Sequence, residues 1–471
     1  MAQTFFFYDL ETSGLNPRQD RIMQFAGQRT DMNLEPIGEP YNLLVTLNDD
    51  TLPSPDALMV TGITPQKTVE EGYTEAQFAR MLSEEIFTPD TIAVGFNNIR
   101  FDDEFIRHLL WRNFHDPYEW SWKDGRSRWD LLDVVRLTRA LRPEGINWPL
   151  DDKGEPSNRL ELITSANGIA HENAHDALAD VTALIAVTKL IKQKQPQLYD
   201  YLLKMRDKKV VQQLVNVDDK KPFVYASGRY DKEFAKTTVA FPLTTSRNGG
   251  VVVYDLRYDP TPFVGLSEEK LAAKIFASWE ERQAEDFVKL PVKELQYNRC
   301  PAVAPLGVLE QGDGWQKISL DLKTVQKYQN ILLNHPDFAE KLRTIFENKP
   351  AFKKLPDPEA QLYDGFLNDR DRLRVEAVRN ADERELADFH PEFQDERLAP
   401  LLLHYKARNF PRSLSEDDLA QWEAWRAQRL QAQLPGFMAS LQRLVSTTTD
   451  EQQFILQELQ LWAEAVLPSS D

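Results

Sequence analysis

The segment Phe5-Phe6-Phe7-Tyr8-Asp9-Leu10-Glu11-Thr12 decides how the first part of this chain folds. Its apolar run predicts a buried β-strand that ends in two carboxylates. Because strand side chains alternate between faces, Asp9 and Glu11 project from the same side of the sheet. Two such anions repel unless a cation lies between them, and oxygen ligands favour Mg²⁺ or Mn²⁺. This pair alone leaves open a second interpretation, an acidic strand end that runs into the turn at Ser13-Gly14.

Two more acidic residues follow other predicted elements. Residues 92–96 predict a strand, and Asp102 lies where the next helix would begin, where it could simply complement the helix dipole. Asp180 falls within a predicted Ala-rich helix. His175 lies five positions before Asp180, which is about 140° around a helix. The two side chains can therefore converge only if His175 lies on the loop before that helix.

Four carboxylates and one histidine from three segments form the set that two-metal phosphoryl hydrolysis requires. The metals bridge the scissile phosphate and stabilise the attacking and leaving oxygens, and a histidine that titrates near neutrality takes the proton from the attacking water. The sequence therefore predicts a metal-dependent phosphodiester hydrolase.

One match in the same region indicates a different chemistry. His171-Glu172-Asn173-Ala174-His175 satisfies the H-E-x-x-H pattern of zinc peptidases. That chemistry needs both histidines on one face of a regular helix, and Gly168 together with Asn173 argues against a continuous helix here. A zinc peptidase would also leave the four acids without a role, so we interpret the match as one that arose by chance.

Two changes of sequence character divide the chain into domains 1–195, 196–350 and 352–471. The first domain combines strand-like runs with helical patterns, which predicts an antiparallel meander joined to parallel units in one α/β sheet. The second reads as a small, mostly β domain, with late strands expected near 287–290 and 301–308. The third is helical, with long helices expected at 416–431 and 436–465 and a boundary at Pro435.

Composition restricts the location and the partners. A single cysteine, Cys300, excludes an internal disulfide and fits a reducing compartment, and no apolar run approaches a membrane span. We therefore expect a soluble, cytoplasmic protein with no membrane partner. The net charge of −18 argues against a nucleic-acid partner when taken alone. Net charge is a sum, however, and a nucleic-acid channel needs only one basic surface.

Several motifs carry a family resemblance. Asp9-x-Glu11, Phe101-Asp102 and His175-x4-Asp180 resemble the motifs of the DEDDh exonuclease superfamily, whose core is RNase H-like. Other segments resemble more closely the bacterial exodeoxyribonuclease I family, essentially along the whole chain. They are residues 97–104 (NNIRFDDE), 120–122 (WSW), 127–133 (SRWDLLD), 141–149 (LRPEGINWP), 361–363 (QLY) and 407–411 (ARNFP).

The resemblance implies a fold and a function. The fold is an RNase H-like α/β nuclease domain, an SH3-like β domain and an all-α C-terminal domain, which together enclose single-stranded DNA. The function is processive 3′→5′ release of 5′-mononucleotides in DNA repair and recombination. Carried over residue by residue, the resemblance implies that two Mg²⁺ ions, which Mn²⁺ can replace, are bound by Asp9, Glu11, Asp102 and Asp180. It also implies that His175 is the general base.

The resemblance also implies contacts with substrate and partner. Glu11 and Arg159 would contact the terminal nucleotide. The acidic C-terminal tail of single-stranded-DNA-binding protein would dock on a basic site that includes Arg142, because arginine pairs well with carboxylates. We expect a monomer, since three domains can enclose a strand without a second subunit.

Aromatic and basic residues that follow residue 117 suit a single-strand path. Bases stack on rings while cations follow the phosphates. Large aromatic residues are usually mostly buried, so each of Trp120, Trp122 and Trp129 could equally belong to the core. Within the family pattern, the DNA contacts that we expect are Tyr118, Trp122, Arg136, Arg142 and Lys208.

Two other functions stay open at this point. A DEDDh nuclease could act mainly on RNA, because the catalytic core does not itself read the sugar and a 2′-OH is admitted or refused by the pocket. A non-catalytic single-strand-binding scaffold could retain a nuclease fold without activity. The intact set of four acids and a histidine argues against the scaffold.

Overall fold

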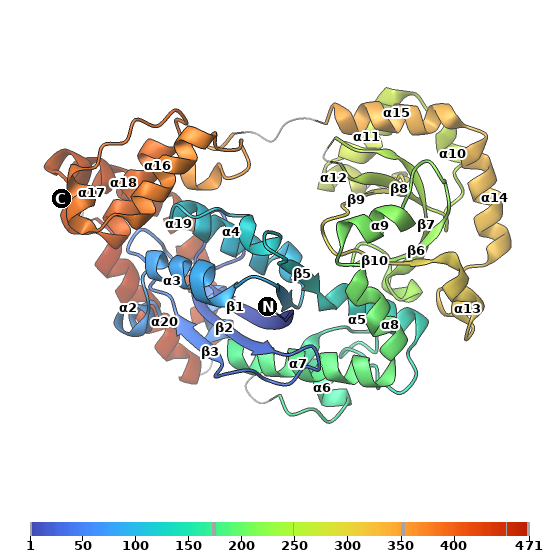
Figure 1. Ribbon diagram of the computed structural model, residues 1–471, viewed down its shortest axis with the longest axis horizontal. Helices are drawn as coiled ribbons and strands as arrows, with labels where there is room; N and C mark the ends of the chain where they lie inside the picture. Colours follow the sequence, from blue (N-terminus) through green and yellow to red (C-terminus); the bar gives the residue numbers. More distant parts are fainter. Residues whose placement is uncertain (1, 172–175, 248, 350–353, 449, 469–471) are drawn as a thin grey trace. The chain divides into compact units, whose positions relative to one another are not determined.

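A computed structural model of the protein describes residues 2–171, 176–247, 249–349, 354–448 and 450–468. The chain forms two compact units (Figure 1). The first comprises Met1–Arg128, His171–Ile185 and Lys353–Asp471, and the second comprises Trp129–Ala170 and Ala186–Phe352. Among the described residues, no helix is both long and apolar enough to cross a membrane.

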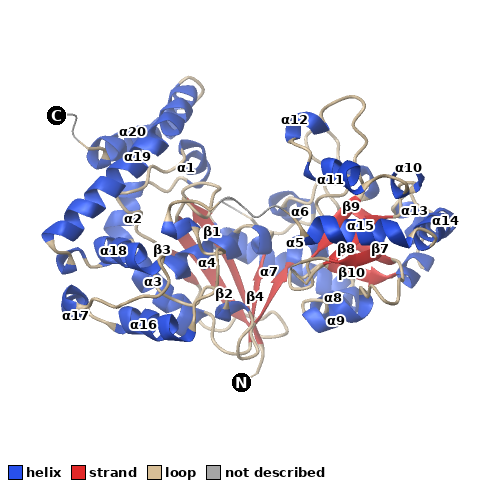
Figure 2. Ribbon diagram, turned by 90° about the horizontal axis from the view of Figure 1, so that it is seen from above, coloured by secondary structure: helices blue, strands red, loops and turns tan. Residues whose placement is uncertain are grey.

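Strand β1 (Thr4–Thr12) is the central strand of a five-stranded sheet in the order β3-β2-β1-β4-β5 (Figure 2). β2 (Ile22–Thr30) pairs with it antiparallel, and β3 (Tyr41–Leu44) continues the meander. β4 (Thr91–Gly95) runs parallel to β1 on its other side, and β5 (Ser127–Asp130) follows. The expected meander joined to a parallel unit is confirmed.

The two faces of β1 have different roles. Phe6, Tyr8 and Leu10 lie in a core with Phe105 and Leu109 of α4 (Asp102–Arg112). Asp9 and Glu11 alternate with these residues and therefore project from the opposite face. The other helices before residue 100 are α1 (Pro55–Thr61), α2 (Pro65–Glu71) and α3 (Glu75–Met81), which continues as a π-helical turn (Leu82–Ile86).

The last hundred residues are helical and belong to the first unit. Their helices are α16 (Asp369–Asn380), α17 (Glu383–Asp388), α18 (Leu398–Asn409), α19 (Glu416–Val445) and α20 (Asp450–Val466). α19 and α20 share a core with Met23 of β2 and Leu58 of α1. Figure 1 shows the C-terminal helices beside α2, α3 and α4. The helical domain therefore packs directly on the nuclease sheet and its helices.

The expected helix boundary at Pro435 is wrong, because α19 continues through it. A proline inside a helix loses one backbone hydrogen bond and costs about 3 kcal/mol. Leu430, Phe437 and Leu441 of the same helix are buried on either side of it. Burying each such side chain contributes roughly 1.5–3 kcal/mol, so tertiary packing outweighs the proline.

The second unit holds a separate five-stranded sheet in the order β10-β6-β7-β8-β9, with all neighbours antiparallel. Its strands are β6 (Phe223–Ala226), β7 (Thr237–Thr245), β8 (Val251–Asp255), β9 (Val292–Leu295) and β10 (Ala302–Pro305). Its longer helices are α5 (Leu131–Leu141), α8 (Pro196–Lys204), α11 (Glu268–Phe276), α14 (Leu322–Leu333) and α15 (Pro336–Glu347). The shorter ones are α6 (Leu160–Ala166), α9 (Lys208–Leu214), α10 (Thr261–Val264), α12 (Trp279–Arg282) and α13 (Gly314–Lys317). The sheet is the β core expected between residues 196 and 350.

The strand expected near 287–290 is wrong: these residues form a loop, and β9 begins at Val292. Lys274 of α11 explains the difference. Its Nζ donates to the backbone carbonyl of Val288 at 2.9 Å and lies 5.5 Å from the Phe287 ring centroid. The apolar run therefore packs against a helix and pairs with no strand. The strand expected near 301–308 is present as β10.

Candidate metal centre

Three of the predicted acids meet at one point of the first unit. One carboxylate oxygen from each of Asp9, Glu11 and Asp180 lies within 4.8 Å of the others. The first two come from β1, and Asp180 lies in the first turn of α7 (Ala177–Lys194). All three side chains are half-buried. Hard oxygen donors at this spacing fit a divalent cation such as Mg²⁺ or Mn²⁺.

Asp102 is the first residue of α4 and is buried. Its charge raises the pKa of both Asp9 and Glu11, which places it within electrostatic reach of the cluster. The structure thus brings four of the five predicted catalytic residues into one electrostatic group. The fifth, His175, lies outside the described residues.

Burial and mutual repulsion hold protons on this cluster. Burial, followed by the charges of Asp102, Glu11 and Asp180, raises the pKa of Asp9 well above its ordinary value. Burial, followed by the charges of Asp180, Asp102 and Asp176, raises the pKa of Glu11 to about 8. Among the described residues, neither Asp9 nor Glu11 has an ion-pair partner. The raised pKa values indicate that the site disfavours this much negative charge, which a bound divalent cation would offset.

A second acidic group in the same unit shows the contrast. Asp357, Glu359 and His404 are also close enough to hold an ion. Glu359, however, pairs with Arg21 at 2.8 Å and with Arg408 at 2.5 Å. Burial alone would raise the pKa of Glu359, but Arg408 and Arg21 lower it well below its ordinary value. This group is already neutralised and needs no metal.

These residues are part of a larger set, which we call the buried ion cluster. It joins the nuclease sheet to the C-terminal helices through alternating charges. Its members are Arg21, Asp50, Glu75, Arg112, Glu359, His404, Arg408 and Arg429.

His171 has a role that sequence reasoning missed. Its Nε2 lies 2.6 Å from Oδ1 of Asp180, and it precedes α7, which begins at Ala177. A zinc-peptidase site would need His171 on a helix, and residues 172–175 of that pattern lie outside the described residues. The sequence offered one indication of this contact: His171 lies in the same segment as His175, nine positions before Asp180.

The expected DNA contacts of the first unit differ in exposure from their neighbours. Trp122 is 64% exposed, whereas Trp120 is 5% exposed and belongs to the core. Tyr118 is half-buried, and its ring lies 6.4 Å from that of Tyr363 and 6.0 Å from that of Phe366. Tyr363 and Phe366, neither of them predicted, are themselves exposed. The Trp122 ring is therefore accessible to a ligand at the surface, and Tyr118 belongs to a group of aromatic rings at the surface.

The remaining predicted contacts lie in the second unit. Arg159, at the N-terminus of α6, is exposed and pairs with Glu161. Arg136 pairs with Asp133 at 2.6 Å. Arg142 donates to the carbonyl of Val308 at 3.3 Å and to Gln311 at 3.0 Å. Lys208 is the exposed first residue of α9. Trp129, also of this unit, is 1% exposed and is a core residue.

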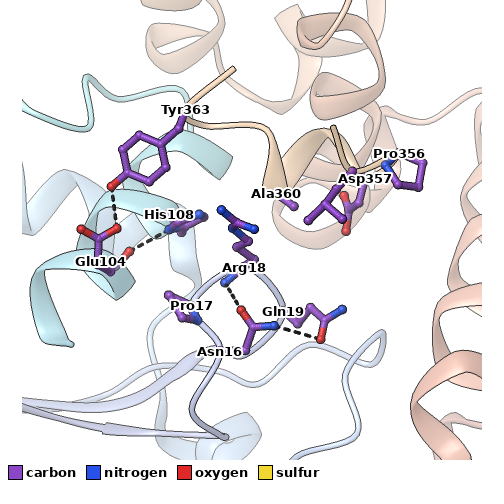
Figure 3. Close-up of a pocket in the computed structure, with 11 residues that line it drawn as sticks. Asn16, Pro17, Arg18, Gln19, Glu104, His108, Pro356, Asp357, Ala360 and Tyr363 are labelled. Atoms are coloured by element: carbon purple, nitrogen blue, oxygen red, sulfur yellow. Dashed lines mark hydrogen bonds between the residues drawn. The ribbon is translucent and has the colours of Figure 1, made fainter. Parts of the chain in front are cut away.

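A pocket of about 540 Å³ opens in the first unit (Figure 3). Residues 16–19, which follow β1, form one side, and Glu104 and His108 of α4 form another. Tyr363 also lines the pocket and donates from its hydroxyl to Oε2 of Glu104 at 2.5 Å. His108 donates from Nδ1 to the backbone carbonyl of Glu104 at 2.9 Å, while its buried Nε2 has no hydrogen-bond partner among the described residues. The pocket walls thus continue directly from the two segments that carry Glu11 and Asp102.

Comparisons with known proteins cover nearly the whole chain. Residues 6–188 match the family model of an exonuclease, 206–348 that of the exonuclease I SH3-like domain, and 356–466 that of the exonuclease I C-terminal domain. Exodeoxyribonuclease I of Escherichia coli K12 is 40% identical over 468 residues, which cover 98% of this chain and 97% of the relative.

Two solved structures agree with this. E. coli exonuclease I in complex with a dA16 oligonucleotide has a TM-score of 0.95 at 39% identity, covering 99% of this chain and 100% of the other. An SSB/exonuclease I structure with the inhibitor CFAM has a TM-score of 0.91 at 38% identity, with the same coverage. The nuclease domain, the SH3-like domain and the C-terminal helical domain expected from the sequence are therefore all present. Matched along its length by sequence and by fold, this chain belongs to the exodeoxyribonuclease I family, whose members are phosphodiester hydrolases.

Proposed function

We propose that this enzyme removes nucleotides from the 3′ end of single-stranded DNA and releases 5′-mononucleotides processively, in DNA repair and recombination. The observation that carries the proposal is the cluster of Asp9, Glu11 and Asp180, with Asp102 beside it. Excess buried negative charge is costly, so a fold that gathers it must gain by binding a cation. The family's name supports DNA as the substrate.

We assign each acid a role in this reaction. Asp9, Glu11, Asp102 and Asp180 hold two Mg²⁺ ions, which Mn²⁺ can replace, because the donor set consists of carboxylate oxygens. When bound, the ions supply a Lewis acid for the phosphate oxygens and a lowered pKa for the attacking water. His175 takes the proton of that water.

Glu11 also has a proposed contact with the 3′-terminal nucleotide, together with Arg159. A carboxylate has two oxygens, so one oxygen of Glu11 can bind a cation while the other accepts a hydrogen bond from the nucleotide. Arg159 is exposed and bears its charge at the surface of its own unit.

Single-stranded DNA as the substrate is supported by the E. coli complex with dA16 and by the exposed rings of this chain. Trp122 and Tyr118 offer faces for base stacking, which contributes roughly 1–3 kcal/mol per base. Arg136, Arg142 and Lys208 follow the phosphates. We propose that the acidic tail of single-stranded-DNA-binding protein docks at Arg142. The SSB/exonuclease I structure supports the choice of partner, and the positive charge of Arg142 suits an acidic tail.

Further proposals concern the organisation of the protein. Domain boundaries at 1–195, 196–350 and 352–471 agree in order with the three family matches. We propose that the enzyme acts as a monomer, in the cytoplasm where the cell's DNA is processed.

A strand-polarity assay tests the proposal. Oligomers labelled at the 3′ or the 5′ end, single- or double-stranded, are incubated with and without Mg²⁺. We expect Mg²⁺-dependent loss of the 3′ label from single-stranded DNA first, with mononucleotide products. Faster degradation of the matching RNA oligomer would favour an RNA nuclease. Binding without hydrolysis would favour the scaffold, and activity restored by zinc but not by magnesium would overturn the metal assignment.

A further inference from the structure

A buried hydrogen bond lies directly behind two of the four acids. Tyr8 precedes Asp9 in β1, and Asp103 follows Asp102 in α4. The hydroxyl of Tyr8 donates to Oδ1 of Asp103, and neither side chain has any exposed surface. The two residues adjoining the predicted metal ligands thus tie the strand to the start of the helix.

Asn98 and Arg128 complete this network from two other elements. Asn98, in the short helix η2 (Asn98–Arg100), donates from Nδ2 to the Tyr8 hydroxyl at 3.3 Å and to Oδ1 of Asp103 at 3.2 Å. Arg128 of β5 pairs through Nη1 with the other oxygen of Asp103 at 2.5 Å. One buried carboxylate is therefore held from three directions, and the arginine neutralises its charge.

Both ends of the network are fixed in place. The Tyr8 ring packs against Phe25 and Phe87, with centroids 6.2 and 5.8 Å away. Asn98 lies against Gly95 at the end of β4, where an added Cβ would come within 2.5 Å of the asparagine Cβ. Only glycine leaves room for the amide to reach the tyrosine and the aspartate.

The network opposes a specific force. The acids of the candidate metal centre repel one another, and Asp102 is the strongest charged contributor to the raised pKa of Asp9. When both carboxylates are charged, repulsion between Asp9 and Asp102 favours a wider separation between β1 and the start of α4. Tyr8 lies on the opposite face of β1 from Asp9, so its bond to Asp103 can resist the separation without entering the site.

We infer that Tyr8, Asn98, Asp103 and Arg128 are positioning residues that hold Asp9 and Asp102 together before a divalent cation binds. The inference rests on the proposed function, since it takes these acids as metal ligands. Outer residues of this kind typically change metal affinity by 10–100-fold when they are replaced.

Calorimetric titration of the full chain with Mn²⁺, in the absence of DNA, tests the inference. Tyr8→Phe removes only the hydroxyl and should weaken Mn²⁺ binding by roughly 10–100-fold. The matched control is Tyr254→Phe, because the Tyr254 hydroxyl is equally buried and has no hydrogen-bond partner among the described residues. It should bind Mn²⁺ as the wild type does.

Activity gives a second measurement. In Tyr8→Phe and in Asp103→Asn, the Mg²⁺ concentration for half-maximal DNA hydrolysis should rise by the same factor, while the rate at saturating Mg²⁺ is largely kept. Wild-type Mn²⁺ affinity in both variants would overturn the inference and leave the proposed function intact. Absence of Mn²⁺ binding by the wild type would overturn the inference, whereas absence of Mg²⁺-dependent degradation from the 3′ end would overturn the proposed function itself.

Discussion

The Nε2 atom of His171 lies 2.6 Å from Oδ1 of Asp180, and the histidine side chain is 4% exposed. The zinc-peptidase pattern would make His171 a metal ligand. In the structure His171 instead contacts Asp180, which we propose as a metal ligand. A carboxylate oriented by a hydrogen bond is already arranged for a cation before the cation arrives.

Replacing His171 tests this arrangement. We expect His171→Ala to lower the rate of DNA hydrolysis by roughly 10–100-fold at limiting Mg²⁺, because Asp180 loses the group that orients it. His171→Gln, which keeps a side-chain donor, should lose less. The measurement is the initial rate over a Mg²⁺ titration, and an unchanged Mg²⁺ dependence in His171→Ala would contradict the expectation.

Removing a carboxylate of the cluster separates catalysis from binding. Asp9→Ala should reduce Mg²⁺-dependent hydrolysis by about 10³-fold or more, since metal ions supply several kcal/mol of transition-state stabilisation. Binding of a fluorescent single-stranded oligomer should persist. Asp369→Ala is the control, because the Asp369 carboxylate is fully exposed. Loss of oligomer binding together with hydrolysis would show that Asp9 does more than hold metal.

The raised pKa of Glu11 predicts the pH dependence of stability. Its folded-state pKa is about 8 against an ordinary value of 4.5, so between these values the folded protein keeps a proton that the unfolded chain loses. The free energy of unfolding of metal-free protein should therefore fall as pH rises from 5 to 8, by about 1.4 kcal/mol per pH unit for one fully retained proton. Urea unfolding in EDTA at several pH values measures this slope. Glu11→Gln should have a shallower slope, and equal slopes would refute the assignment.

The buried ion cluster predicts a large loss of stability on removing one charge. Glu359→Gln leaves Arg21 and Arg408 short of a counter-charge in the interior, which should cost about 3–5 kcal/mol. Arg443→Ala breaks an exposed pair with Asp56 and should cost at most about 1 kcal/mol. Denaturant unfolding followed by tryptophan fluorescence compares them, since Trp422 and Trp425 contact His404 of the cluster. Equal losses would mean that burial does not govern these pairs.

Replacing Trp122 and replacing Trp120 should change two different properties of the protein, DNA binding and stability. Trp122→Ala removes a 64% exposed ring and should weaken single-stranded DNA binding by roughly 1–3 kcal/mol while leaving stability unchanged. Trp120→Ala empties a core position and should destabilise the protein by about 3–5 kcal/mol. Fluorescence anisotropy with a labelled oligomer and thermal unfolding measure the two effects. Unchanged DNA affinity in Trp122→Ala would remove this residue from the strand path.

Sequence reasoning succeeded where the physical cause is local. The alternation along β1 separates Phe6, Tyr8 and Leu10 from Asp9 and Glu11, and this period of two follows from strand geometry alone. The position of Asp102 at a helix start follows from the change of pattern after residue 96. Both features need no knowledge of distant contacts.

It failed where tertiary contacts decide. A proline inside α19 is tolerated because side chains distant in the chain cover Leu430 and Phe437. The apolar run at 287–290 packs against Lys274 and joins no strand. Asp103 looked like one of several acids in a row, and only the fold reveals that Arg128, twenty-five positions later, neutralises it.

The buried ion cluster makes the nuclease and the C-terminal helices a single unit for engineering. The sheet side contributes Arg21 and Asp50, while their partners Glu359, Arg408 and Arg429 come from beyond residue 353. A fragment that ends before those helices would leave unpaired charges and the apolar surface around Met23 open to water. A shortened or fused version of this nuclease must therefore retain its last hundred residues, even if they never touch the bond that is cut.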